Sequence, residues 1–332
     1  MMRLALILVL AFALVPTVLI LAAHLALRRG AWRVAGVLGS AVPYVAGPTY
    51  GRRLAFLCQV LALRESAQLE AAAALARDCL ADETVPMSSR NAAIDVLISA
   101  GGYEAALAAE PPPEPEVTGE EATSRALIQL NLAEAEYNLG GWDAAEERLR
   151  RVQASCQRIA LTRAWLGQQR AWIAAHRGRG EEALVLCAAV DPRAIPRIYE
   201  SEYHFTVAVA LLCAGRLEEA QAAVAAGERA ALRLSSRRNA LFLRARVAAA
   251  RPDWTAAERL CREAAQHPFR GQGGAGLLLW ARALRELGRP IEAEDALRLA
   301  CARDPESESA RTASATLSSF WNDLTTRDST PG

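Results

Sequence analysis

The sequence of 332 residues contains no lysine, so its side-chain positive charge comes from arginine alone apart from histidine. A P-loop needs a lysine to reach the nucleotide phosphates, and a protein kinase needs one on its third strand. Pyridoxal enzymes use a lysine to form their Schiff base. The absence of lysine therefore excludes all three classes.

The sequence also lacks an excess of charge of either sign and is poor in strand-forming residues. Its formal net charge is +1, so no strong field attracts it to nucleic acid. Alanine is abundant, whereas Val, Ile, Tyr, Phe and Thr are sparse, and 52% of the residues are apolar. This composition predicts an all-α fold with enough apolar surface for a core.

No cluster of metal ligands or nucleophiles occurs in the sequence. The four histidines are dispersed, and seven cysteines occur without a C-x-x-C pair: Cys58, Cys79, Cys156, Cys187, Cys213, Cys261 and Cys301. An odd number of cysteines cannot pair completely within the chain, which favours a reducing compartment. We therefore expect no metal site, no cofactor and no catalytic residue.

An uncharged apolar segment runs from Leu4 to Leu27. Its 24 residues are long enough to cross about 30 Å of hydrocarbon as a helix, and they exceed the apolar core of a secretory signal. We predict an uncleaved transmembrane anchor over residues 1–29. Arginines follow the segment in greater number than they precede it, which places the rest of the chain in the cytoplasm. The alternative topology puts it in the periplasm.

Residues 30–51 follow the anchor and are predicted to form a membrane-proximal linker. Their uncharged stretch 34–50 raises the alternative of a second span. Pro43, Gly47 and Pro48 disfavour one continuous helix there.

A pattern of small residues recurs through the rest of the chain. One alanine recurs at intervals of 39, 38, 37, 37 and 36 residues, at Ala106, Ala145, Ala183, Ala220, Ala257 and Ala293. A second precedes each of the last five by 12 residues, at Ala133, Ala171, Ala208, Ala245 and Ala281. A turn marked by glycine, or once by Pro252, lies between the two. Apolar residues flank each turn at helical spacing, so each unit is predicted to be a helical hairpin whose alanines allow close approach.

This pattern resembles the tetratricopeptide repeat family. The shared features are the glycine turn, an aromatic or apolar residue such as Tyr103, Trp142 or Trp254, the alanines, and the terminal Asp304-Pro305. The period here is longer than the family's usual length of about 34 residues. The resemblance implies a right-handed α-solenoid of antiparallel hairpins. It further implies a non-catalytic adaptor or scaffold whose partner is a protein or peptide segment.

The repeat sets the expected boundaries of the remaining segments. Residues 52–109 form the first, degenerate hairpins, and 110–121 form a loop rich in proline and glutamate. The repeat array follows over 122–305, and a capping helix over 306–325 covers its open end with Leu317, Phe320, Trp321 and Leu324. Residues 326–332 are predicted to be disordered.

The resemblance also indicates a binding groove, because the first helix of each hairpin lines the concave surface in that family. The corresponding positions here are Trp165, Gln168, Trp172, Phe205, Phe242, Arg246, Arg282 and Arg285. We expect an apolar or amphipathic segment along this groove, with the arginines contacting its acidic groups. The alternative is that these aromatic residues only pack between helices.

Two other functions stay open. An enzyme built on helical hairpins is one, although the only literal motif is "GQGGAG" at 271–276, which follows a predicted helix and not the strand that dinucleotide binding requires. We interpret it as a flexible loop between repeats. An RNA-binding repeat protein is the other, suggested by Arg233, Arg237, Arg238, Arg244 and Arg246 but disfavoured by the neutral net charge. We expect no nucleic acid partner.

Overall fold

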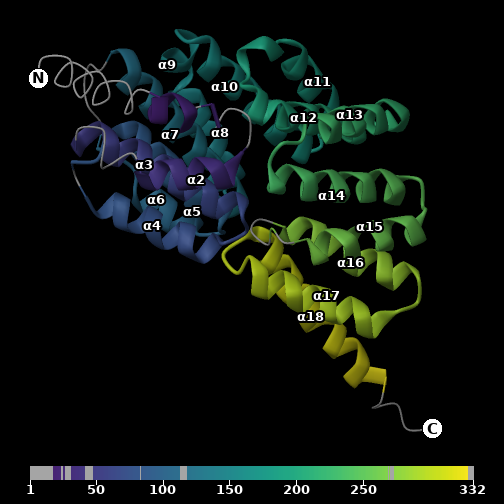
Figure 1. Ribbon diagram of the computed structural model, residues 1–332. Coiled ribbons are helices and arrows are strands. Elements are labelled where there is room, and N and C mark those ends of the chain that lie inside the picture. Colours follow the sequence, from purple (N-terminus) through teal and green to yellow (C-terminus); the bar gives the residue numbers. More distant parts are fainter. Residues whose placement is uncertain are drawn as a thin grey trace, which may run out of the picture.

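The structure is a curved array of helical hairpins (Figure 1). This computed structural model describes residues 18–23, 25–26, 31–41, 48–82, 84–112, 118–267, 269 and 273–327. Every regular element within these ranges is a helix. The predicted all-α class is therefore confirmed for the described part of the chain.

Seven hairpins follow one another among the described residues. Their paired helices are α3 (Pro48–Glu65) with α4 (Leu69–Ala81), α5 (Met87–Ser99) with α6 (Tyr103–Ala108), α7 (Gly119–Asn138) with α8 (Trp142–Arg151), α10 (Ala160–His176) with α11 (Gly180–Ala188), α12 (Glu200–Cys213) with α13 (Leu217–Ala230), α14 (Leu234–Ala250) with α15 (Trp254–Gln266), and α16 (Gly274–Glu286) with α17 (Pro290–Arg303). The additional helices are α2 (Trp32–Ala41), α9 (Gln153–Gln157) and α18 (Glu308–Arg327), with 3₁₀ turns at Pro192–Ala194 and Arg197–Tyr199.

The repeated alanines lie where the helices of each hairpin touch. All eleven are 0 to 2% exposed. Because an alanine side chain is a single methyl group, the two helix backbones can approach closely at these positions. Their burial is consistent with the predicted role of the alanines.

The glycine turns end the first helix of the hairpins in a common way. Gly140 has φ +77° and Gly178 has φ +79°, a left-handed conformation that residues with a Cβ rarely adopt. The next amide then bonds back across the turn, Gly141 N to Glu136 O at 2.8 Å and Arg179 N to Ala174 O at 2.8 Å. This C-terminal cap satisfies a helix carbonyl and reverses the chain.

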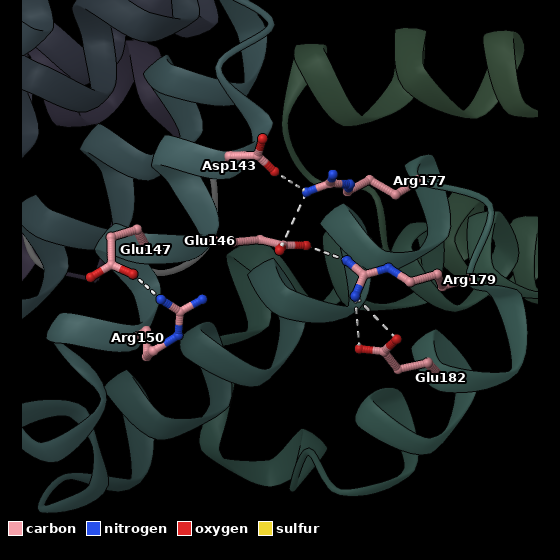
Figure 2. A network of polar contacts seen from close by, with 7 residues as sticks. All are labelled: Asp143, Glu146, Glu147, Arg150, Arg177, Arg179 and Glu182. Carbon is pink, nitrogen blue, oxygen red and sulfur yellow. Dashed lines mark hydrogen bonds and ion pairs between the residues drawn. The ribbon is translucent and has the colours of Figure 1, made fainter.

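Charged side chains at the turns link consecutive hairpins (Figure 2). Arg179 pairs with Glu146 of the preceding hairpin and lies 3.2 Å from Glu182 of its own. Arg177 lies 2.6 Å from Asp143, whose side chain is 90% exposed. These contacts form a ladder of ion pairs in contact with solvent.

The ladder recurs at two later turns. Arg251 lies 2.8 Å from Glu218, and Arg289 lies 3.6 Å from Glu258. In each case the arginine of one turn reaches a carboxylate on the second helix of the hairpin before it. The pairing between hairpins thus occurs at three turns among the described residues.

The array curves far enough for its later hairpins to meet the first ones. Glu65, at the end of α3, accepts hydrogen bonds from Leu234 N at 2.8 Å and Arg233 Nε at 3.3 Å, both at the start of α14. Arg64 Nε lies 3.1 Å from the same carboxylate. The Glu65 side chain is 0% exposed, so these charges meet in the interior.

A second set of contacts joins the last turn to the early hairpins. Tyr103 Oη, at the start of α6, donates to Asp304 Oδ2 at 3.2 Å. Trp142 Nε1, at the start of α8, donates to Glu308 Oε2 of α18 at 3.1 Å. Together with the contacts of Glu65, these form the closure seam, which brings both ends of the repeat array together.

Part of the predicted membrane anchor lies outside the described residues. Within the described part, Ile20 and Ala23 pack against Leu38 of α2 and Cys58 of α3. No helix among the described residues has the length and hydropathy needed to span a membrane. The segment predicted as a linker contains α2, which packs against α3.

The C-terminal helix differs from the expected cap. Leu317 packs against the last hairpin as expected, whereas the side chains of Phe320, Trp321 and Leu324 and residues 328–332 lie outside the described residues. The start of α18 contacts α8 through Glu308. The end of the array is therefore closed by the early hairpins as well as by α18, because the curvature returns it to them.

Candidate functional site

The concave side of the array forms a partly open chamber of about 590 Å³. Residues from the first helix of six successive hairpins line it, on α5, α7, α10, α12, α14 and α16. Six aromatic side chains contribute to its wall: Tyr137, Trp165, Trp172, Tyr199, Phe205 and Phe242. The volume lies within the range of about 300 to 1,000 Å³ that is typical of small-molecule sites.

Six of the eight predicted groove residues line this chamber, namely Trp165, Gln168, Trp172, Phe205, Phe242 and Arg246. Their placement follows from the repeat, because equivalent positions on successive first helices face the same side. Phe205 is 2% exposed and belongs to the core between hairpins. Trp165 and Trp172 are only partly buried, so they both pack against the core and border the chamber.

The other two predicted residues lie elsewhere. Arg282 and Arg285 are exposed and line a separate hollow that also includes Thr316 of α18. Helix α18 packs against α16 and α17, so the second half of α16 meets α18, while its beginning and Leu279 face the chamber. Arg282 lies over the Trp254 ring at 5.2 Å from its centroid.

Several chamber residues were not identified from the sequence. Tyr199 lies in a 3₁₀ turn before α12 and contacts Trp165 edge to face, with ring centroids 5.0 Å apart. The Arg233 guanidinium lies over the Tyr199 ring, 5.1 Å from its centroid. The turn has no helical periodicity, and no pattern in the sequence marks it as part of the wall.

The acidic side chains of the chamber are engaged by neighbours. Asp95 accepts from Arg64 at 2.5 Å, and Glu202 accepts from Ser236 Oγ at 2.6 Å. Asp304 accepts from Tyr103, and burial raises the pKa of its carboxyl.

Arg246 is in a different situation. It is half-buried in the chamber wall, and no carboxylate of the described residues forms an ion pair with it. Burial lowers the pKa of its guanidinium. Desolvation lowers the pKa of His176, and the positive charge of Arg246 lowers it further. The chamber therefore presents a cation whose charge nothing nearby neutralises within the described residues.

The glycine-rich motif is partly helical, which corrects the prediction of a loop. Gly274 and Gly276 lie in the first turn of α16, and the segment before the motif is the helix α15. A Cβ on Gly276 would come within 2.3 Å of the Phe242 ring, so the glycine allows that ring to pack on the helix backbone. Gly276 thus has a packing role at the start of α16.

The arginines that suggested RNA binding do not share one surface. Arg233 and Arg238 are 7% and 3% exposed, Arg246 borders the chamber, and Arg244 lies on an exposed face 3.5 Å from Glu228. No group of three or more potential metal ligands is assembled among the residues with described positions.

These features define an α-helical repeat protein with a chamber on its concave side. Residues 274–317, which cover α16, α17 and the start of α18, match the profile of the tetratricopeptide repeat. The match covers one hairpin of the array and the start of α18, so this part of the chain is tetratricopeptide-like. The membrane anchor stays a separate prediction.

Comparison with whole proteins adds little to this assignment. A search of curated proteins finds no match. A chain in "Crystal structure of APC/C hetero-tetramer Cut9-Hcn1" is similar over 94% of this chain and 77% of its own, at 13% identity and a TM-score of 0.35. With so low a score, the overlap carries no argument about function.

Proposed function

We propose that the protein is a non-catalytic adaptor or assembly scaffold that binds a short segment of a protein partner in its concave chamber. The observation that carries this proposal is the chamber wall, to which six successive hairpins each contribute their first helix. Partly buried Trp165 and Trp172 offer apolar contact area there. Aromatic residues of this kind supply much of the energy of protein interfaces.

The proposal includes attachment to the membrane through residues 1–29, with the repeat array on the cytoplasmic side. The support is the uncharged segment from Leu4 to Leu27 and the arginines that follow it. Deletion of residues 1–29 is expected to move the protein from the membrane fraction to the soluble fraction. Retention of the shortened chain in carbonate-washed membranes would contradict the anchor, and protease access from each side tests the topology.

Site-specific photocrosslinking in native membranes tests the chamber. A photoreactive amino acid is placed at Trp172, which borders the chamber, and in a second variant at Val185, which is 71% exposed on α11. We expect a discrete crosslinked partner from position 172 that position 185 does not yield. Identical products from both positions, or none from position 172, would reject the chamber as the binding site.

A double variant, Trp165→Ala with Trp172→Ala, separates binding from folding. We expect partner capture to fall more steeply than the fraction of folded protein at the assay temperature. A loss of stability without a selective loss of capture would show that the tryptophans act only in the core.

A further inference from the structure

The position of Arg246 is unusual for a charged residue. Moving a charge out of water is unfavourable unless a partner or hydrogen bonds compensate, so half-buried arginines in proteins are generally paired. Arg233, which directly precedes the same helix, follows this rule, since it reaches the buried carboxylate of Glu65 at 3.3 Å. Arg246 has no such carboxylate among the described residues. The chain thus keeps an uncompensated cation at the wall of a cavity.

Aromatic side chains line the same chamber as this cation. Phe242 lies one helical turn before Arg246 on α14, so both side chains emerge on the same face. The Phe242 ring is held against the backbone at Gly276. Trp172 contacts the His176 ring, with centroids 4.4 Å apart, and the lowered pKa of His176 keeps that imidazole neutral near pH 7. A ligand bound here would meet one positive charge and aromatic walls.

The other charges of the chamber limit the charge of that ligand. Glu134 and Glu202 line the same cavity. Their carboxylates repel a polyanion such as a phosphate ester, while a single carboxylate bound at Arg246 needs to overcome less repulsion. An arginine can also bind one carboxylate through two parallel hydrogen bonds. Charge and geometry therefore favour a monoanion.

We propose that Arg246 forms an anion subsite of the chamber and that this subsite binds the carboxylate of a small organic acid with an apolar or aromatic body. The chamber volume of about 590 Å³ suits a ligand of that size. The proposal shares with the proposed function only the assumption that the chamber is a binding site. It adds the chemical group, a carboxylate, that the chamber selects.

Matched pairs of fragments test the subsite on the full-length chain in lipid nanodiscs. Each pair consists of an acid and its neutral amide: benzoate and benzamide, phenylacetate and phenylacetamide, indole-3-acetate and indole-3-acetamide. Dissociation constants are measured by ligand-observed NMR titration. We expect the acids to bind about tenfold more tightly than the amides, because a charged hydrogen bond distinguishes them. Arg246→Gln should abolish this difference, and Arg246→Lys should retain part of it.

The matched control is Arg244→Gln, two residues away on α14, where the guanidinium faces Glu228 and solvent. It should leave the preference for acids unchanged. The proposal is overturned if acids and amides bind alike, if no fragment binds, or if the preference survives in Arg246→Gln. If Arg246→Gln does not fold, two measurements on the unaltered chain test the subsite instead. Acids should bind more tightly than their amides, and added NaCl should weaken the binding of the acids. If either result is absent, the proposal is overturned.

These results are distinguishable from a failure of the adaptor proposal. Preference for acids without a partner crosslinked at position 172 would reject the adaptor and retain the subsite. A crosslinked partner together with no preference for acids would retain the adaptor and reject the subsite.

Discussion

The same residue types, arginine and carboxylate, meet in two settings in this protein. In the ladder of Figure 2, Arg177 and Arg179 join consecutive hairpins through exposed pairs with carboxylates. In the closure seam, Glu65 joins the first described hairpin to a hairpin about 170 residues later, and its side chain is fully buried. An exposed ion pair adds little to the free energy of unfolding, because water solvates both charges when they are apart. Removing one partner from a buried pair is costly, because the remaining charge has neither a partner nor solvent. The ladder therefore assists local register, and the seam determines whether the array closes.

The largest effect is expected from Glu65→Ala, which leaves the buried guanidinium of Arg64 and that of Arg233 without this carboxylate. We expect the free energy of unfolding to fall by about 3 to 5 kcal/mol. Urea denaturation followed by circular dichroism measures the change. Glu65→Gln is the control, because it keeps an acceptor for Leu234 N and should lose less. A loss below about 1 kcal/mol for Glu65→Ala would contradict a closed array in solution.

A smaller effect is expected from Tyr103→Phe, which removes the hydroxyl that donates to buried Asp304. An acceptor that loses its donor in the interior destabilises by about 1 to 3 kcal/mol. The matched control is Tyr203→Phe, whose hydroxyl lies 3.3 Å from Cys187 O within adjacent hairpins. If the two variants unfold at the same urea concentration, the contact across the seam has no special weight.

Acidification should weaken the folded state moderately. Burial lowers the pKa of His204 and His267, and loss of solvent lowers that of His176 to about 4. Between the ordinary value of about 6.5 and these lower values, the unfolded chain binds more protons than the folded one. Stability is therefore complete above pH 6.5 and falls as the pH decreases. The slope is well below about 1.4 kcal/mol per pH unit for each histidine, because His176 keeps an exposed surface and solvent weakens the effect of its surroundings.

Unfolding midpoints between pH 7.5 and pH 5 measure this slope. Replacement of His176 by glutamine should flatten it, since the variant has no proton to bind at that position. An unchanged slope would show that His176 keeps its ordinary pKa. The raised pKa of Asp304 acts in the opposite direction at lower pH, which is why the measurement stops at pH 5.

The smallest effect is expected from Arg179→Ala in the ladder. The variant loses exposed pairs with Glu146 and Glu182, so we expect a change below about 1 kcal/mol. That change should shrink further in 0.5 M NaCl, because salt screens exposed charges. A loss comparable to that of Glu65→Ala would remove the distinction between ladder and seam.

The parts of the structure that the sequence predicted are those governed by near neighbours in the chain. The alanines at 36- to 39-residue spacing identified the hairpins, and glycines such as Gly140 and Gly178 identified their turns. Periodicity also placed Trp165 and Trp172 on the wall of the chamber. These inferences succeed because helix geometry relates residues a few positions apart, and a repeat applies the same relation many times.

The features that differ from the simple repeat pattern depend on contacts between distant parts. Arg282 and Arg285 occupy repeat positions like those of the chamber residues, yet α18 packs against that part of the array. Gly274 and Gly276 belong to a helix whose packing partner, Phe242, lies more than thirty residues earlier. No local pattern contains this information.

By itself, the sequence determined an all-α chain of repeated hairpins, with alanines at their contacts and glycines at most of their turns, because those features depend on backbone conformation and side-chain size over about forty residues. The tertiary structure alone decided that the array closes, that Tyr103 meets Asp304 across 201 positions, and that Arg246 lies in a chamber with no carboxylate partner among the described residues. The reason is that small rotations between successive hairpins accumulate along the array. Their sum, which no single repeat encodes, decides which distant side chains meet.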